Sequence, residues 1–198
     1  VYLHEYARSS RFAGYIRLGV NNLAGVPSIV FGLFGMSFFV ITCGFGISLL
    51  SGVLTLAVLT LPVVISTAEE ALRQVPLALR EASFALGASQ SQTIARVVLP
   101  SAMPGMLTGA ILGLARASGE TAVIMFTAAV FFTKAGADSL FRPVMALPNH
   151  IYVLATSGTE LQQTMPLQYG TALVPFRRVN GMNMAANILC DPLQKRQR

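Results

Sequence analysis

The chain has 198 residues, of which 54% are hydrophobic and only 11% are charged, and its formal net charge is +6. A typical soluble domain has about 25% charged residues, so this composition excludes an ordinary soluble fold. The positive charges are not gathered with aromatic residues into one basic face, which argues against a nucleic-acid partner. We therefore expect an all-α, polytopic transmembrane helix bundle whose apolar helices lie in the lipid bilayer.

A long uncharged run near the start contains the first predicted membrane spans. From Leu18 to Ala68 there are 51 consecutive residues without Asp, Glu, Lys, Arg or His. A helix needs about 20 apolar residues to cross the hydrocarbon core, so the run has room for two spans. We predict one span over 21–43 and a second over 47–66. Gly44 and Gly46 mark the turn between them.

The remaining chain predicts a polar connection, a third span and a weaker candidate for a fourth. The connection covers 69–100 and is long enough for one or two short helices. The third span starts after Pro104 and runs to about Phe132. The last apolar segment, 169–190, contains the sequence PFRRVN, and each Arg near a helix centre costs about 2.5 to 3.5 kcal/mol on insertion scales. We therefore predict three clear spans and give the fourth less weight.

The charges between the spans predict the orientation of the chain. Segments 4–17 and 69–100 are separated by two spans and so lie on the same side of the membrane. The opposite connections hold only Lys134 and Arg142. Because basic residues favour cytoplasmic loops, we expect 69–100 to be cytoplasmic. The arginines on that side are Arg8, Arg11, Arg17, Arg73, Arg80 and Arg96.

The connection has a helical pattern that a simple loop does not need. The connection includes the stretch REASFALGASQSQTIARVVLP, residues 80–100. Leu79, which directly precedes it, and Ala82 and Leu86 within it recur at helical spacing. Gly87 then permits a sharp turn of the backbone. An amphipathic helix lying on the membrane surface is one explanation of this pattern.

The same connection resembles the EAA loop of ABC-importer permeases. The family pattern is E-A-A, three residues, G, nine residues, I, one residue and L-P. Here Ser83 stands for the second Ala and Val97 for the Ile. The resemblance implies a helix that docks into a groove on the ATP-hydrolysing subunit and transmits its closure to the membrane helices. The residues that match the motif are Glu81, Ala82, Ser83, Gly87, Val97, Leu99 and Pro100.

Further segments resemble the permeases of the bacterial phosphate ABC transporter. They are NLAGVPSIVFGLFG (22–35), ARASGET (115–121), LPNHIY (147–152) and YGTALV (169–174). VYLHEYA near the start and YGTALV near the end favour the PstA type over the PstC type. The likeness covers residues 1–174, whereas 175–198 diverges from the leucine-rich pattern of the family. These permeases have six spans and Val1 is not an initiator Met, so we expect a single permease domain over 1–198 that is N-terminally truncated.

The resemblance implies a non-catalytic subunit of the bacterial inner membrane. The implied partners are an ABC ATPase subunit, a second, PstC-like permease subunit and an extracytoplasmic phosphate-binding protein. We expect no cofactor on this chain, because ATP would bind to the partner and the sequence has no G-x-x-x-x-G-K-[ST] loop. The sequence also offers no metal-ligand cluster and no nucleophile–base set.

Arg116 and Glu120 are the charged residues inside the predicted third span. They are four residues apart and share one helical face. Counted from Gly105 at 1.5 Å per residue, Arg116 is roughly 17 Å into the membrane, where an ionisable residue is a candidate for function. The planar fork of Arg suits an oxyanion, and the resemblance to phosphate permeases favours a role in the substrate pathway. Alternatively, the two side chains neutralise each other and fix helix packing.

Three other functions stay open. The first is an ABC-importer permease for another substrate, such as sulfate or an amino acid. The second is an ion-coupled transporter or channel that uses Arg116 and Glu120 without an ATPase. The third is a remnant that does not transport, which the divergent last segment would explain.

Overall fold

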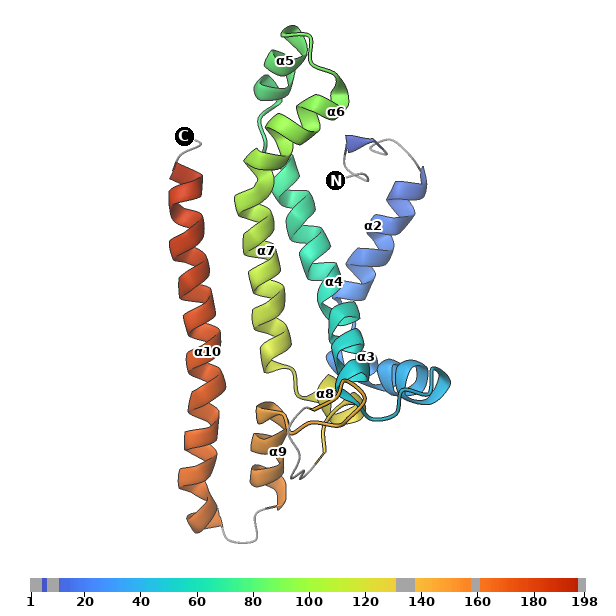
Figure 1. The fold of residues 1–198 in the computed structure, drawn as a ribbon, viewed down its shortest axis with the longest axis vertical. Coiled ribbons are helices and arrows are strands. Elements are labelled where there is room, and N and C mark those ends of the chain that lie inside the picture. The colour runs from blue at the N-terminus through green and yellow to red at the C-terminus, as the bar shows by residue number, and fades with distance from the viewer. Residues whose placement is uncertain (1–4, 7–10, 131–137, 158–160, 196–198) are drawn as a thin grey trace. The chain divides into compact units, whose positions relative to one another are not determined.

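The computed structural model describes residues 5–6, 11–130, 138–157 and 161–195 (Figure 1). Within these ranges the regular structure is helical, apart from an isolated bridge between Ala129 and Val144. The all-α prediction is therefore confirmed. The elements in chain order are α2 Arg11–Ala24, α3 Ser28–Gly35, the π-helix η1 Met36–Thr42, α4 Leu49–Arg73, α5 Leu77–Ala85, α6 Gln90–Thr93, the π-helix η2 Ile94–Val98, α7 Leu99–Gly119, α8 Ala122–Thr127, α9 Leu147–Ser157 and α10 Leu161–Lys195.

The chain divides into two compact units. The first comprises Val1–Gly25, Leu61–Gly113 and Asn183–Arg198, and the second comprises Val26–Thr60 and Leu114–Met182. The long helices α4, α7 and α10 each contribute residues to both units. Residues 77–100 hold the EAA-type motif; we call them the coupling segment and their first helix, α5, the coupling helix. This segment belongs to the first unit, and Arg116 and Glu120 belong to the second.

The prediction of one continuous span over 21–43 is wrong. Helix α2 begins at Arg11 and ends at Ala24, and a new helix starts at Ser28. Pro27 has an extended backbone, with ψ at 140°, and a proline also disfavours helical geometry in the residue before it. The proline thus ends one helix and begins the next. Because α2 begins at Arg11, part of the polar segment 4–17 is also helical.

Two helices in the described ranges are long and apolar enough to cross a membrane, or up to three if α2 and the helix over 28–42 count as one broken span. The first is α4, Leu49–Arg73, which extends the predicted second span. The second runs without a break from Gln90 to Gly119. The predicted bounds of the third span were therefore wrong at both ends, because this helix starts well before Pro104 and stops before Phe132. Helix α10 does not meet the same criterion.

The wide turn of η2 has a local cause in the sequence. Pro100 has no backbone N–H, and in a regular α-helix its ring would meet the carbonyl of Arg96. The π-helical turn over Ile94–Val98 precedes this proline directly and makes room for the ring. The helix therefore continues through Leu99-Pro100 into α7 rather than restarting there.

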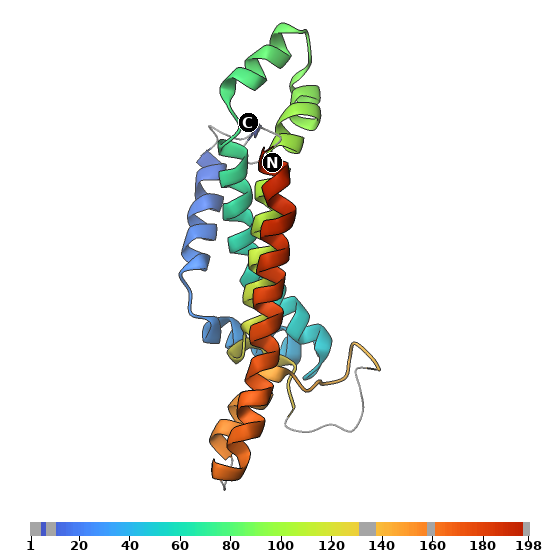
Figure 2. The same ribbon diagram turned by 90° about the vertical axis from the view of Figure 1, so that its left-hand side faces the viewer.

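In the first unit, α4 and α7 pack closely below α5 and α6. A small apolar core contains Ala71, Leu72, Val75, Val98 and Ala102. The helices approach closely because α7 has glycine where it meets α4: a Cβ added to Gly105 would lie 2.6 Å from the Cβ of Ala71. In Figures 1 and 2, α5 and α6 project beyond the neighbouring ends of α4 and α7.

In the second unit, the start of α4 is held by a loop. The N–H groups of Ser48, Leu49 and Leu50 donate to the carbonyls of Thr127, Arg142 and Leu140 at 2.8 to 3.0 Å. A helix start leaves its first N–H groups without partners in the helix, so the carbonyl at the end of α8 and the two loop carbonyls satisfy them. Phe31, Leu59 and Val123 form the apolar core of this unit.

Candidate functional site

Six of the seven motif residues of the EAA loop lie on helical elements of the first unit, and Gly87 lies in the turn after α5. Glu81, Ala82 and Ser83 are in α5, Val97 is in η2, and Leu99 and Pro100 open α7. Glu81 and Ala82 are exposed, whereas Ser83 is half-buried. The structure thus forms a helix at the predicted place and leaves its acidic residue accessible.

Gly87 makes the corner after α5. Its φ is +84°, in the left-handed region that other residues rarely adopt. Nothing lies within 4 Å of a Cβ added there. The corner therefore needs glycine for its backbone conformation, and not because a larger side chain would clash with a neighbour. The next helix begins at once, because Ser89 forms a reciprocal capping box with Gln92 at the start of α6.

Ser83, which departs from the family pattern, has a defined partner. Its hydroxyl lies 2.9 Å from the hydroxyl of Thr93. Thr93 is itself buried beside Ile94 at the start of η2. The serine therefore ties α5 to the segment that leads into α7, a bond that the alanine of the family pattern would not form.

Helix α5 and its corner expose large apolar side chains. Leu77 is 65% exposed and Leu86 is 89% exposed. Leu79 and Phe84 are exposed by nearly half. We call these four residues the α5 surface. Large apolar side chains left exposed on a short helix that also carries an exposed acidic residue are the kind of contact that a protein-binding site uses.

Arg116 and Glu120 form an ion pair in the second unit. The Arg116 Nε lies 3.7 Å from the Glu120 Oε1, and the side chains are 40% and 14% exposed. Arg116 occupies the last turn of α7, where the helix dipole favours a cation. The depth predicted by counting from Gly105 assumed a different helix start, and Arg116 is at the end of its helix rather than near the middle.

The neighbouring hydroxyl does not extend this pair. Ser118 donates back to the carbonyl of Leu114 in its own helix at 2.9 Å, which is a common local bond for a helical serine. The ion pair therefore remains the candidate substrate contact. Among the described residues, no group of three or more His, Cys, Asp or Glu is arranged to hold a metal ion.

Two polar features of the structure were missed from the sequence. Ser48, just before α4, and Ser51 and Thr55 in its first turns are fully buried. Each makes a hydrogen bond, such as Thr55 to the Ser51 carbonyl at 2.7 Å. Their spacing of three and four residues was visible in the uncharged run. The second feature, an ion pair between Glu5 and Arg80, joins residues far apart in the chain and had no such signal.

Comparison with known proteins identifies the family. The model of the family described as binding-protein-dependent transport system inner membrane component matches residues 3–156. The chain belongs to this family.

Individual relatives of this family member are similar over most of its length. It is 35% identical over 99% of the chain to the probable ABC transporter permease protein YqgI of Bacillus subtilis, and covers 70% of that protein. It is 41% identical over 88% of the chain to the phosphate transport system permease protein PstA of Xylella fastidiosa, covering 60% of that protein. It is 39% identical over its whole length to PstA 1 of Mycobacterium tuberculosis, covering 63% of it. The resemblance to PstA-type permeases is confirmed.

A solved structure supports the fold assignment. The inward-facing MetNI methionine ABC transporter matches with a TM-score of 0.73 over 95% of this chain and 78% of that one. The sequence identity is 21%, so this likeness concerns the fold. The fold is that of an ABC-importer permease.

Proposed function

We propose that this chain is the membrane-conducting permease subunit of an ATP-driven importer for inorganic phosphate. It acts in the bacterial inner membrane, with the connection 69–100 on the cytoplasmic side. Its partners are an ABC ATPase subunit, a second permease subunit of the PstC type and an extracytoplasmic phosphate-binding protein. ATP binds and is hydrolysed on the ATPase subunit, and this chain has no catalytic role.

The α5 surface is the observation that carries the coupling role. Four large apolar side chains are exposed on one short helix and its corner, and this helix contains the EAA-type residues Glu81, Ala82 and Ser83. A groove on the ATPase subunit that accepts α5 would bury these side chains and remove apolar area from water. The exposed Glu81 is then available for an ion pair with that subunit.

Phosphate as the substrate is supported by two observations. Relatives that are about 40% identical over most of the chain are named as phosphate transport permeases. Arg116 offers a partly exposed guanidinium, which binds a tetrahedral oxyanion through paired N–H donors. In the proposed cycle, Glu120 holds Arg116 in place and phosphate competes transiently for it.

Crosslinking tests the coupling role directly. Cys43 and Cys190 are first replaced by Ser, the substitution Ala82→Cys is then made, and the permease is co-expressed with the phosphate-transporter ATPase subunit. We expect a thiol-to-amine reagent to join the thiol introduced at position 82 to that subunit. Replacing Gly87 by Ala should weaken the crosslink several-fold, because a left-handed backbone costs a residue with a Cβ about 1–2 kcal/mol and the corner after α5 must change.

A matched control separates this effect from general strain. Gly44 also has a positive φ, +70°, and open space around it, but it lies outside the coupling segment. Gly44→Ala should therefore leave the crosslink unchanged. An inserted protein that gives no crosslink would contradict the proposal and favour a channel that works without an ATPase.

A further inference from the structure

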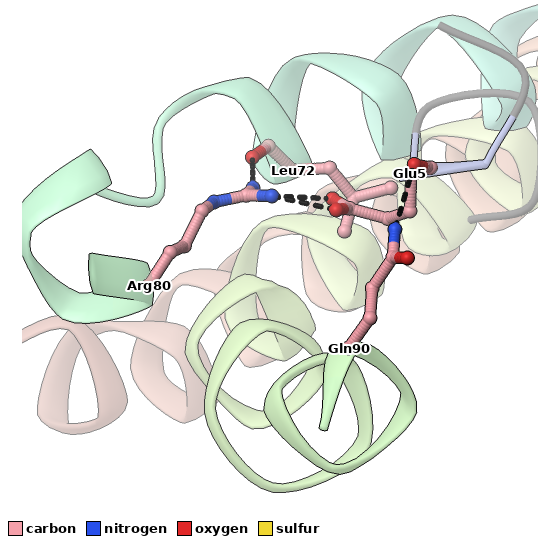
Figure 3. A network of polar contacts seen from close by, with 4 residues as sticks. All are labelled: Glu5, Leu72, Arg80 and Gln90. Atoms are coloured by element: carbon pink, nitrogen blue, oxygen red, sulfur yellow. Dashed lines mark hydrogen bonds and ion pairs between the residues drawn. The ribbon is translucent and has the colours of Figure 1, made fainter. Parts of the chain in front are cut away.

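A buried ion pair joins the N-terminal segment to the coupling helix. The Arg80 Nη1 donates to both carboxylate oxygens of Glu5, at 2.8 Å to Oε1 and 2.6 Å to Oε2 (Figure 3). Seventy-five positions separate the two residues in the sequence. The contact is therefore tertiary, and it involves the residue directly before Glu81 of the motif.

Both charges are largely withdrawn from water. The side chain of Glu5 is 8% exposed and that of Arg80 is 14% exposed. A buried charge is tolerated when it is paired and hydrogen-bonded, so each residue lowers the cost of burying the other. The two residues therefore depend on each other in a way that an exposed surface pair does not.

The same guanidinium also fastens α5 to α4. The Arg80 Nη2 donates to the carbonyl of Leu72 at 3.1 Å, and Leu72 lies in the last turn of α4. Carbonyls at a helix end have no partner within the helix, so this bond satisfies one of them. Arg80 thus spans the short bend between the two helices and restricts the angle between them.

Glu5 has a second contact with the coupling segment through its backbone. The amide of Gln90, at the start of α6, donates to the Glu5 carbonyl at 3.4 Å (Figure 3). Glu5 therefore contacts the coupling segment on both sides of the Gly87 corner. The end of α4, α5 and α6 all meet at this one residue pair.

A further ion pair attaches α2 to α4. The Arg17 Nε lies 3.1 Å from the Glu69 Oε1 of α4. The N-terminal part of the chain is thus bonded to the coupling segment through Glu5 and to α4 through Arg17. A movement of α5 that preserves these bonds must also move Glu5.

We propose that Glu5 and Arg80 are positioning residues that hold the coupling helix α5 at a fixed angle to α4, so that movement of α5 passes into α4 as well as into α7. The inference rests on the proposed function, because it needs an ATPase subunit that moves α5. It adds a route for that movement which the EAA motif does not include. Without the pair, α5 still docks, but its movement is passed on incompletely.

The test uses the complete importer, with the full-length permease and its three partners, in proteoliposomes. The quantity measured is phosphate taken up per ATP hydrolysed. We expect Glu5→Gln and Arg80→Gln each to lower this ratio about fivefold or more, the lower end of typical coupling between sites. The double variant should be no worse than the more affected single variant, since both changes break the same link. The matched control is Glu70→Gln. Glu70 is an exposed carboxylate on α4 that accepts a hydrogen bond from the nearby Gln74, so this variant should leave the ratio unchanged.

The crosslink from position 82 separates failure of this inference from failure of the proposed function. A retained crosslink with a lowered ratio supports the inference, whereas a retained crosslink with a normal ratio in both single variants overturns it. If the protein with Glu5 and Arg80 intact gives neither crosslink nor phosphate uptake, the proposed function is overturned, and the inference with it.

A second variant keeps the test decisive if Glu5→Gln does not assemble. Glu5→Asp keeps the charge and shortens the side chain by one methylene. That variant should assemble with a lowered ratio, and a normal ratio would again overturn the inference.

Discussion

Replacing Arg116 by Gln is expected to reduce phosphate uptake by at least about thirtyfold while the permease still inserts and assembles. In the proposed cycle phosphate is enclosed against Arg116, and losing one charged partner of such a contact costs about 2–5 kcal/mol, which corresponds to roughly thirtyfold or more. Glutamine keeps hydrogen-bond donors but lacks the charge and the planar fork that suit an oxyanion. The measurement is initial uptake of labelled phosphate, normalised to the amount of inserted protein.

The chain offers a close control for this substitution. Arg142 and Asp138 form another ion pair at a spacing of four, 3.6 Å apart, with both side chains more than half exposed. Arg142→Gln should leave uptake near the wild-type rate, because such exposed pairs contribute little. Loss of assembly in Arg116→Gln would instead support the alternative that Arg116 and Glu120 only fix helix packing.

Replacing Gly109 by Ala is expected to destabilise the first unit. A Cβ at this position would overlap the side chain of Thr67 on α4. Thr67 is β-branched and so has few side-chain rotamers with which to move away. Overpacking of this kind costs about 1–3 kcal/mol. Thermal unfolding of the detergent-solubilised protein should show a Tm lower by several degrees, at roughly 2–4 °C per kcal/mol.

The same substitution at an open glycine should have the opposite sign. Gly19 lies in α2, and nothing is within 4 Å of a Cβ added there. Alanine is favoured over glycine inside a helix by about 0.5–1 kcal/mol, so Gly19→Ala should leave the Tm unchanged or raise it. Equal shifts in the two variants would mean that the close approach of α7 to α4 does not limit stability.

The helix and the glycine turn near residues 77–87 were predicted well because their signals are local. The helical spacing of apolar residues located α5, and the glycine of the motif is the residue with φ at +84°. Both features depend on neighbours within a few positions, which a sequence shows directly. The roles of Glu81, of Arg116 and of the other site residues remain predictions that the experiments above address.

The membrane spans were predicted less well because hydropathy ignores backbone geometry. The uncharged run suggested one helix over 21–43, but Pro27 divides it. The third span was expected to start after Pro104, yet the helix runs from Gln90 through the π-helical turn at η2. In both cases a proline decided where the helix ends or continues, and not the apolar content.

The sequence alone determined that this is a helical membrane protein, and its motif spacing pointed to the permease family to which it belongs. Composition and local periodicity carry that information, because they govern solvent preference and short-range backbone structure. Only the tertiary structure revealed the pairing of Glu5 with Arg80 and the packing of Gly109 against Thr67. Each joins residues 42 or more positions apart, since 109 − 67 is 42 and 80 − 5 is 75. Such contacts depend on how helices pack, and no pattern within one helix specifies its partner.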